Sequence, residues 1–206
     1  MAKGIISVKP SAGAPKGKIV VTDGKSSTGS TTQTIEIGTE VDYTRSVNES
    51  VGDTVEFIFD PALGAVITNV VATGGKVIGN SGDKLVVAAN EVVIITGTQD
   101  GKVNVNGGNL ILAAGAKVTS KIESATPGSY IISNGALVSA KIEITGASYV
   151  SIKKTTVEGK VGTDGTIYTT VRDCTIEGSL EVINTGDCHC SNNQVDGNTN
   201  TPNNIP

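Results

Sequence analysis

Two cysteines and the only histidine of the chain stand next to each other, as Cys188, His189 and Cys190. Thiolates and imidazoles are preferred ligands of zinc and other soft metals, so these three residues are the candidate metal ligands. On a β-strand, alternate side chains point to opposite faces, which would separate both sulfur atoms from the imidazole. One chain is therefore not expected to close a tetrahedral site with all three. Two other roles are open to these residues. The thiols can fill a narrowing core. Alternatively, His189 from three chains can hold one metal ion on a three-fold axis.

Paired carboxylates are the second candidate for chemistry, because glycosidases use two of them beside the scissile bond. Glu158 and Glu177 are one repeat apart, and Asp173 and Asp187 form another possible pair. A column of exposed glutamates is more often a solvated surface, here with Lys160 nearby. The surrounding repeats also leave no room for loops that would build a cleft. The sequence therefore favours a protein that is not an enzyme and that has no bound cofactor.

The segment that carries these residues has an internal repeat of about 19 or 20 residues. Two apolar columns share this period: Val118, Val138, Val157 and Ile176; then Ile122, Ile142, Val161 and Leu180. Such a repeat is typical of a solenoid, in which each turn buries its inner face only by stacking on its neighbours. We predict a right-handed parallel β-helix of about six rungs over residues 74–198.

Several details follow from this prediction. Glycine and asparagine should occupy the corners, where left-handed dihedrals are needed. A column of tyrosines, Tyr130, Tyr149 and Tyr168, should stack as a ladder. Residues 188–195 should form a last, shortened rung, followed by a polar C-terminal tail over residues 199–206.

Residues 1–73 have a different pattern, with short apolar runs separated by Gly, Pro, Ser and Asp. Five strands are predicted, at residues 4–9, 18–22, 33–37 continuing towards 41–43, 54–60 and 65–71. The polar stretch 23–32 is predicted to be a mobile loop. The complete chain is therefore expected to be all-β, with a small five-stranded OB-like barrel before the β-helix.

Four segments of this first part fall in the order and spacing of the cold-shock domain: Lys3-Gly4-Ile5-Ile6, Lys16-Gly17-Lys18-Ile19-Val20, Val41-Asp42-Tyr43 and Val51-Gly52-Asp53-Thr54-Val55-Glu56-Phe57. About a third of the chain thus resembles that family, which is a five-stranded OB barrel. The resemblance implies binding of single-stranded nucleic acid through Tyr43 and Lys18. However, Val8 and Ile19 stand where the family has aromatic rings, and base stacking on such rings supplies much of the affinity.

The second part is similar to two further groups. The rung Gly135-Ala136-Leu137-Val138-Ser139-Ala140-Lys141-Ile142 resembles those of bactofilins, which are cytoskeletal β-helices that polymerise end to end. The combination of a small N-terminal barrel with a short β-helix resembles fibre, spike and capsid-decoration proteins of phages.

Composition and charge exclude several functions. The net charge is −4, so the chain lacks the excess of basic residues that nucleic-acid binding normally needs. No apolar run approaches a membrane span or a signal peptide, so synthesis in a cytoplasm without export is expected. The three cysteines are an odd number, which argues against a secreted disulfide framework.

The sequence therefore predicts a non-enzymatic structural protein that is part of a virion, with one domain as anchor and the other projecting. Its partners would be other protein subunits, from a capsid lattice or as further copies in a homotrimer, and not a membrane. The alternatives are a bactofilin-like scaffold in the cytoplasm and a cold-shock relative that binds single-stranded nucleic acid. A barrel and a polar last rung that cap the two ends of the solenoid would disfavour an open filament.

Overall fold

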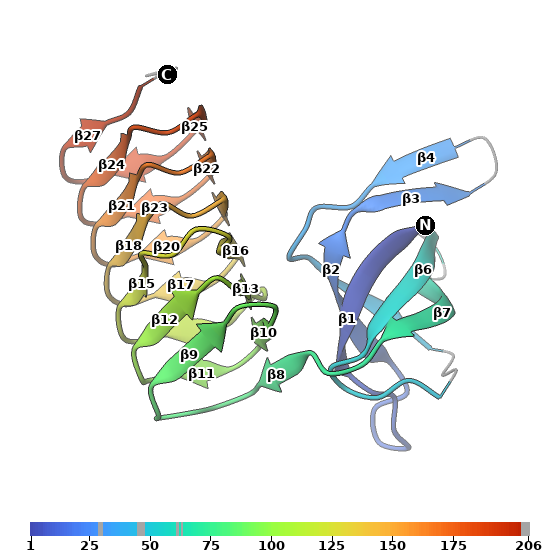
Figure 1. Ribbon diagram of the computed structural model, residues 1–206. Helices are drawn as coiled ribbons and strands as arrows, with labels where there is room; N and C mark the ends of the chain where they lie inside the picture. The colour runs from blue at the N-terminus through green and yellow to red at the C-terminus, as the bar shows by residue number, and fades with distance from the viewer. Residues whose placement is uncertain (29–30, 45–47, 61, 63, 203–206) are drawn as a thin grey trace. The chain divides into compact units, whose positions relative to one another are not determined.

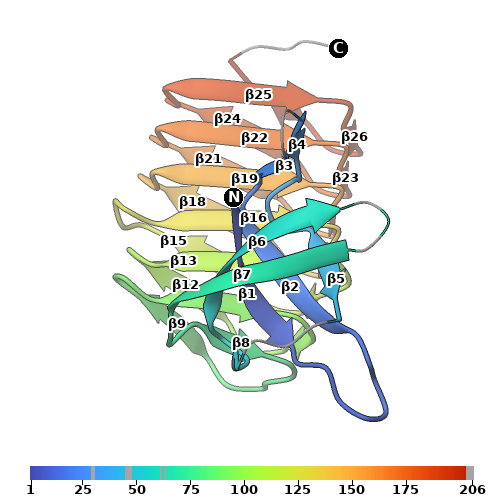
Figure 2. The ribbon, with the colours of Figure 1, turned by 90° about the vertical axis from the view of Figure 1, so that its right-hand side faces the viewer.

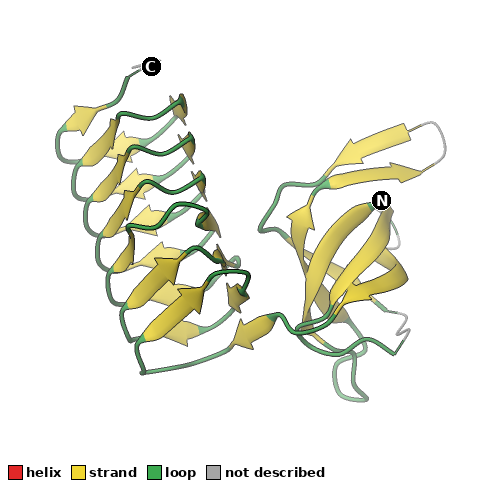
Figure 3. Ribbon diagram, in the orientation of Figure 1, coloured by secondary structure: helices red, strands yellow, loops and turns green. Residues whose placement is uncertain are grey.

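A computed structural model of the chain describes residues 1–28, 31–44, 48–60, 62 and 64–202, and of residues 25–28 and 31–33 the backbone alone. The regular secondary structure of these residues is all β-strand (Figure 1, Figure 3), which confirms the predicted class. Among them no helix is long and apolar enough to cross a membrane. The chain divides into two compact units, Met1–Val77 and Ile78–Pro206.

The first unit is a closed barrel with the strand order β1-β2-β5-β7-β6. Its strands are β1 (Ala2–Val8), β2 (Gly17–Asp23), β5 (Glu40–Tyr43), β6 (Thr54–Asp60) and β7 (Gly64–Ala72). Neighbours pair antiparallel except for β5 and β7, which meet in parallel at Tyr43 and Ala65 and so close the barrel. The five-stranded OB-like barrel predicted for this part is thereby confirmed.

The stretch 23–32 was predicted to be a mobile loop, and the loop prediction is wrong for its described residues; residues 29 and 30 lie outside them. The backbone forms an antiparallel hairpin of β3 (Lys25–Thr28) and β4 (Thr31–Thr34), paired from Lys25 with Thr34 to Thr28 with Thr31. Threonine is β-branched and favours extended backbone even in a polar segment. The hairpin has no alternation of apolar and polar residues, which is the pattern that normally indicates a strand.

The second unit is a parallel solenoid whose strands stack in three sheets (Figure 2). The first sheet contains β8 (Lys76–Ile78), β10 (Val92–Ile95), β13 (Asn109–Leu112), β16 (Tyr130–Asn134), β19 (Tyr149–Lys153), β22 (Tyr168–Arg172) and β25 (Asp187–Ser191). The second contains β11 (Thr98–Gln99), β14 (Lys117–Val118), β17 (Leu137–Val138), β20 (Thr156–Val157), β23 (Thr175–Ile176) and β26 (Gln194–Val195). The third contains β9 (Leu85–Ala88), β12 (Val103–Asn106), β15 (Ile122–Ser124), β18 (Ile142–Thr145), β21 (Val161–Asp164), β24 (Leu180–Ile183) and β27 (Thr199–Asn200).

The predicted apolar columns are confirmed by the register of the strands. In the second sheet Val118 pairs with Val138, which pairs with Val157, and the third-sheet column follows the same steps from Ile122 to Leu180. Residues of both columns are buried in one continuous core. Each turn therefore buries its apolar face against the turns before and after it.

The solenoid is longer than the approximately six rungs predicted, since two of its sheets have seven strands in the described part of the chain. The additional turn begins at β8, where the columns are less regular. At the other end, the last rung is not shortened, because it has the three strands β25, β26 and β27. Strand β27 pairs with β24 and includes Thr199 and Asn200, which were predicted to lie in the tail.

The corners follow the predicted dihedral rule with two exceptions. Gly135, Asn184 and Asn192 have positive φ, as expected for glycine and asparagine at a bend. Lys154 and Asp173 have φ of 48° and 56° at the bends after β19 and β22. Aspartate adopts this conformation more readily than most residues do, whereas lysine does not, so the Lys154 bend keeps the geometry of the repeat at a cost.

One buried hydroxyl group offers a test of this core. Thr163 is 2% exposed in β21, and its Oγ1 has no hydrogen-bond partner. A buried polar atom without a partner costs about 1–3 kcal/mol. We therefore expect Thr163→Val to raise the free energy of unfolding by about 1–2 kcal/mol, measured by urea denaturation. Thr155→Val is the matched control and should destabilise, because its hydroxyl lies 2.8 Å from the Lys153 carbonyl oxygen, to which it donates.

Candidate functional site

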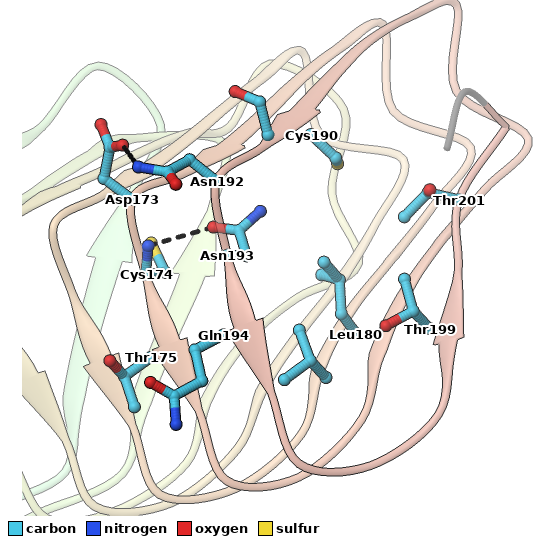
Figure 4. A pocket seen from close by; sticks show the side chains of 12 residues that line it. Asp173, Cys174, Thr175, Leu180, Cys190, Asn192, Asn193, Gln194, Thr199 and Thr201 are labelled. Atoms are coloured by element: carbon cyan, nitrogen blue, oxygen red, sulfur yellow. Dashed lines mark hydrogen bonds between the residues drawn. The ribbon is translucent and has the colours of Figure 1, made fainter. Parts of the chain in front are cut away.

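A cavity of about 790 Å³ lies at the C-terminal end of the solenoid (Figure 4). Its lining includes Leu180 and Val195 from the core, Thr199 from β27, and the thiol-bearing residues Cys174 and Cys190. Strands β25, β26 and β27 are the last in their sheets, so the end of the core opens here. This end therefore places two thiols of the solenoid, those of Cys174 and Cys190, at the border of the cavity.

The two sulfur atoms of the Cys-His-Cys sequence lie inside. Cys188 and Cys190 are 6% and 8% exposed, and their Sγ atoms are 3.4 Å apart, within reach of an S–H···S hydrogen bond. His189 points outward, with a side chain that is 60% exposed. The predicted separation of the sulfur atoms from the imidazole is thus present. The residues that the structure describes contain no group of three or more His, Cys, Asp or Glu side chains placed to hold a metal ion.

His189 belongs instead to a column of rings on the outside. Tyr130 and Tyr149 stack with ring centroids 5.9 Å apart, and Tyr149 and Tyr168 with centroids 4.9 Å apart. The predicted tyrosine ladder is therefore confirmed. The His189 ring follows at 5.7 Å from Tyr168, tilted by 49°, and its Nε2 lies 3.2 Å from Asp187 Oδ1. Each stacked aromatic pair contributes about 0.5–1.5 kcal/mol to stability beyond the contribution of its buried area. The ladder therefore stabilises the solenoid.

The third thiol is held by the backbone. Cys174 Sγ donates towards the carbonyl oxygens of Arg172 and Ile152, at 3.2 and 3.4 Å. Burial raises the pKa of Cys174 to about 11 and that of Cys190 to about 12, the latter also through the hydrogen bond with Cys188. Both thiols are therefore protonated and weakly nucleophilic at neutral pH.

The raised pKa of Cys174 predicts a loss of stability at high pH. Between pH 9 and about 11, the unfolded thiol loses its proton while the folded thiol keeps it, so unfolding becomes more favourable as pH rises. Relative to Cys174→Ala, the wild type should lose about 1.4 kcal/mol per pH unit in this window and nothing below it. Urea titrations of both proteins under reducing conditions at pH 8, 9 and 10 measure this difference. A constant difference across these pH values would contradict the prediction.

The candidate catalytic carboxylates are not arranged as a site. Glu158 and Glu177 follow β20 and β23 on successive turns and are exposed. Neither lines the cavity at the end of the solenoid. Asp173 accepts hydrogen bonds from Asn192 Nδ2 at 2.6 Å, and pairs with Arg172. Asp187 lies at the start of β25, whereas Asp173 follows the end of β22, so these two carboxylates are at opposite ends of neighbouring strands.

A ladder of ion pairs on the third sheet was not predicted from the sequence. Lys121 lies 2.9 Å from a carboxylate oxygen of Glu123 and 2.5 Å from one of Glu143. Lys102 and Lys141 pair with the same two glutamates at 2.5 and 3.0 Å. Hydrogen bonds to these lysines lower the pKa of both carboxyl groups, and the glutamates raise the pKa of Lys121. The recurrence of lysine directly before the third-sheet strands from β9 to β21 is the signal that indicates this ladder.

The barrel buries Tyr43, the residue for which the cold-shock resemblance implies base stacking. The ring is fully buried among the core residues and lies over Gly17, where a Cβ would come within 2.3 Å of it. Its hydroxyl group donates to Glu49 Oε1 at 2.8 Å. Lys18 is exposed, but its Nζ lies 2.9 Å from Glu40 Oε2. A glycine in β2 allows the tyrosine to face inward, which the spacing of strands alone does not reveal.

Comparisons with known proteins assign the chain to no group, since no family model, no curated protein and no solved structure matches it.

Proposed function

We propose that the chain is a non-enzymatic structural subunit of a virion, such as a capsid-decoration, head-fibre or spike protein. One unit would anchor the chain and the other would project from the surface. Its partners would be other protein subunits, either a capsid lattice or further copies of itself in a closed oligomer such as a trimer.

The observation that carries this proposal is the absence of long connections within the described solenoid. From β16 to β26, strands are joined by two or three residues, such as 135–136 after β16 and 139–141 after β17. Catalytic and binding residues are found mostly on loops that a scaffold positions. A rod built without such loops supplies a rigid, regular surface instead.

The charges on the rod support the same proposal. Glu123 and Glu143 are neutralised by three lysines, and such a network holds carboxylates ionised and in place. A general acid needs a raised pKa, whereas these carboxyl groups have lowered ones. The ladder therefore favours a structural surface.

A second candidate function, a bactofilin-like cytoplasmic scaffold, is favoured by one observation. Within the described residues, strands β25, β26 and β27 have a partner strand on one side only, and they border a cavity at the end of the solenoid. Unpaired strand edges can pair with those of another molecule. A rod extended in this way would be an open polymer.

Light scattering on a sizing column, run at several protein concentrations, separates these functions. We expect one closed oligomer whose mass does not change with concentration. Open-ended growth would support the scaffold, and a monomer at all concentrations would contradict self-assembly. As controls, neither single-stranded oligonucleotide binding at low salt nor release of reducing sugar from polysaccharides should be detected. Glu158→Gln and Glu177→Gln would abolish such release if it were catalysed by the chain.

A further inference from the structure

The last strand of the first sheet differs from the strands below it in what it buries. Cys188 pairs with Thr169 of β22, and Cys190 pairs with Val171, so two thiols replace a hydroxyl and an isopropyl group in the same inward columns. The thiols are adjacent, with their sulfur atoms 3.4 Å apart. The final rung thus places a dithiol at the open end of the core.

One thiol of this pair borders the cavity at the end of the solenoid. Cys190 lines that cavity, as does the apolar side chain of Leu180 (Figure 4). Val195 lines it too. Because β25 is the last strand of its sheet, no further strand of the described solenoid covers the thiols from that side. An ion or small molecule in the cavity can therefore approach Cys190, beside which the strand holds the Cys188 sulfur atom.

The geometry is better suited to a bridging atom than to a disulfide. Residues two apart on one strand have Cα atoms about 6.6 Å apart, which is near the upper limit for a disulfide, and the sulfur atoms would have to close to about 2.05 Å. Two thiolates on opposite sides of one two-coordinate ion, with bonds of about 2.3 Å, are separated by about 4.6 Å. The observed separation is 3.4 Å, so binding requires the two sulfur atoms to move apart by about 1.2 Å.

The number and chemical type of the ligand atoms determine which class of metal ion the site can bind. Hard cations such as Mg²⁺ and Ca²⁺ take oxygen ligands, and structural zinc takes four ligands. The described residues supply no third metal-binding side chain next to the pair. Soft thiolate ligands select Cu(I), which accepts a low coordination number. We propose that Cys188 and Cys190 form a dithiol site for a thiophilic monovalent cation of the Cu(I) class, inside the open end of the solenoid.

Binding at this site exchanges two protons for one ion. Each thiol releases its proton to the solvent and forms one sulfur–copper bond, and the oxidation state of copper does not change. Cys174 does not take part, because its thiol is directed at the carbonyl oxygens of Arg172 and Ile152. It therefore serves as a matched control in the same cavity.

The test is anaerobic competition for Cu(I) between the full chain and a coloured Cu(I) chelator, bathocuproine disulfonate. The wild type and Cys174→Ala should each remove one Cu(I) per chain with similar affinity. Cys190→Val and Cys188→Thr should bind at least about 100-fold more weakly, since each removes one of two ligands. Both substitutions repeat the residue of the preceding rung, so the stacked columns are preserved, and thermal unfolding followed by circular dichroism verifies the fold.

A second probe is phenylarsine oxide, which reacts with two adjacent thiols to form two sulfur–arsenic bonds and one water molecule. Mass spectrometry of the folded wild type and of Cys174→Ala should detect one adduct per chain, and none on Cys190→Val. The proposal is overturned if wild type and Cys190→Val bind Cu(I) equally, or if Cys174→Ala weakens binding as much as the other variants do.

Discussion

Replacing Ile142 with alanine is expected to lower the free energy of unfolding by about 2–5 kcal/mol. Ile142 is 1% exposed and pairs with Ile122 on the turn before and Val161 on the turn after. Removing three carbon atoms here leaves a cavity that the neighbouring turns cannot close without losing their own register. Urea denaturation followed by circular dichroism measures the change.

Glu143, the next residue of β18, is the matched control, because successive side chains on a strand point to opposite faces of the sheet. Glu143 lies on the outer surface and pairs with Lys121 and Lys141. Exposed ion pairs contribute about 0–1 kcal/mol, so Glu143→Ala should have at most a small effect. If Glu143→Ala cost as much as Ile142→Ala, the inward and outward faces of β18 would be assigned wrongly.

The same alternation explains why the solenoid was predictable from the sequence. A turn of this fold is stable only when it repeats the apolar residues of its neighbours, so the columns of Val118 and Ile122 are visible without any structure. The tyrosine ladder was visible for the same reason. The opposed directions of Cys188 and His189 followed from the two-residue period of a strand.

Features that do not depend on a repeat of apolar residues were not predictable in this way. The sequence of β3 and β4 consists of lysine, serine, threonine and glutamine, and thus has no apolar period. The lysines of the third-sheet ladder do repeat, but their pairing with Glu123 and Glu143 depends on which face each side chain occupies. The closeness of the Cys188 and Cys190 sulfur atoms depends on side-chain rotation, which no spacing determines.

The inward position of Tyr43 predicts the second large effect. Its hydroxyl group and the carboxyl group of Glu49 are both fully buried and 2.8 Å apart. Tyr43→Phe keeps the ring but removes a donor from a buried carboxyl group, which costs about 1–3 kcal/mol. We expect that loss in the free energy of unfolding, with faster amide hydrogen exchange in β2 and β5.

The matched control is the same substitution in an exposed ring. Tyr130 is 43% exposed, so Tyr130→Phe should change stability by less than about 0.5 kcal/mol. Burial, together with the hydrogen bond to Glu49, holds the pKa of Tyr43 well above its usual range. The unfolded phenol ionises first as pH rises above 10, so the wild type should lose stability there and Tyr43→Phe should not lose this contribution. Equal effects of the two substitutions would mean that the Tyr43 ring is at the surface. In that case the stacking contact inferred from the cold-shock resemblance would be restored, and the chain should then bind single-stranded oligonucleotides.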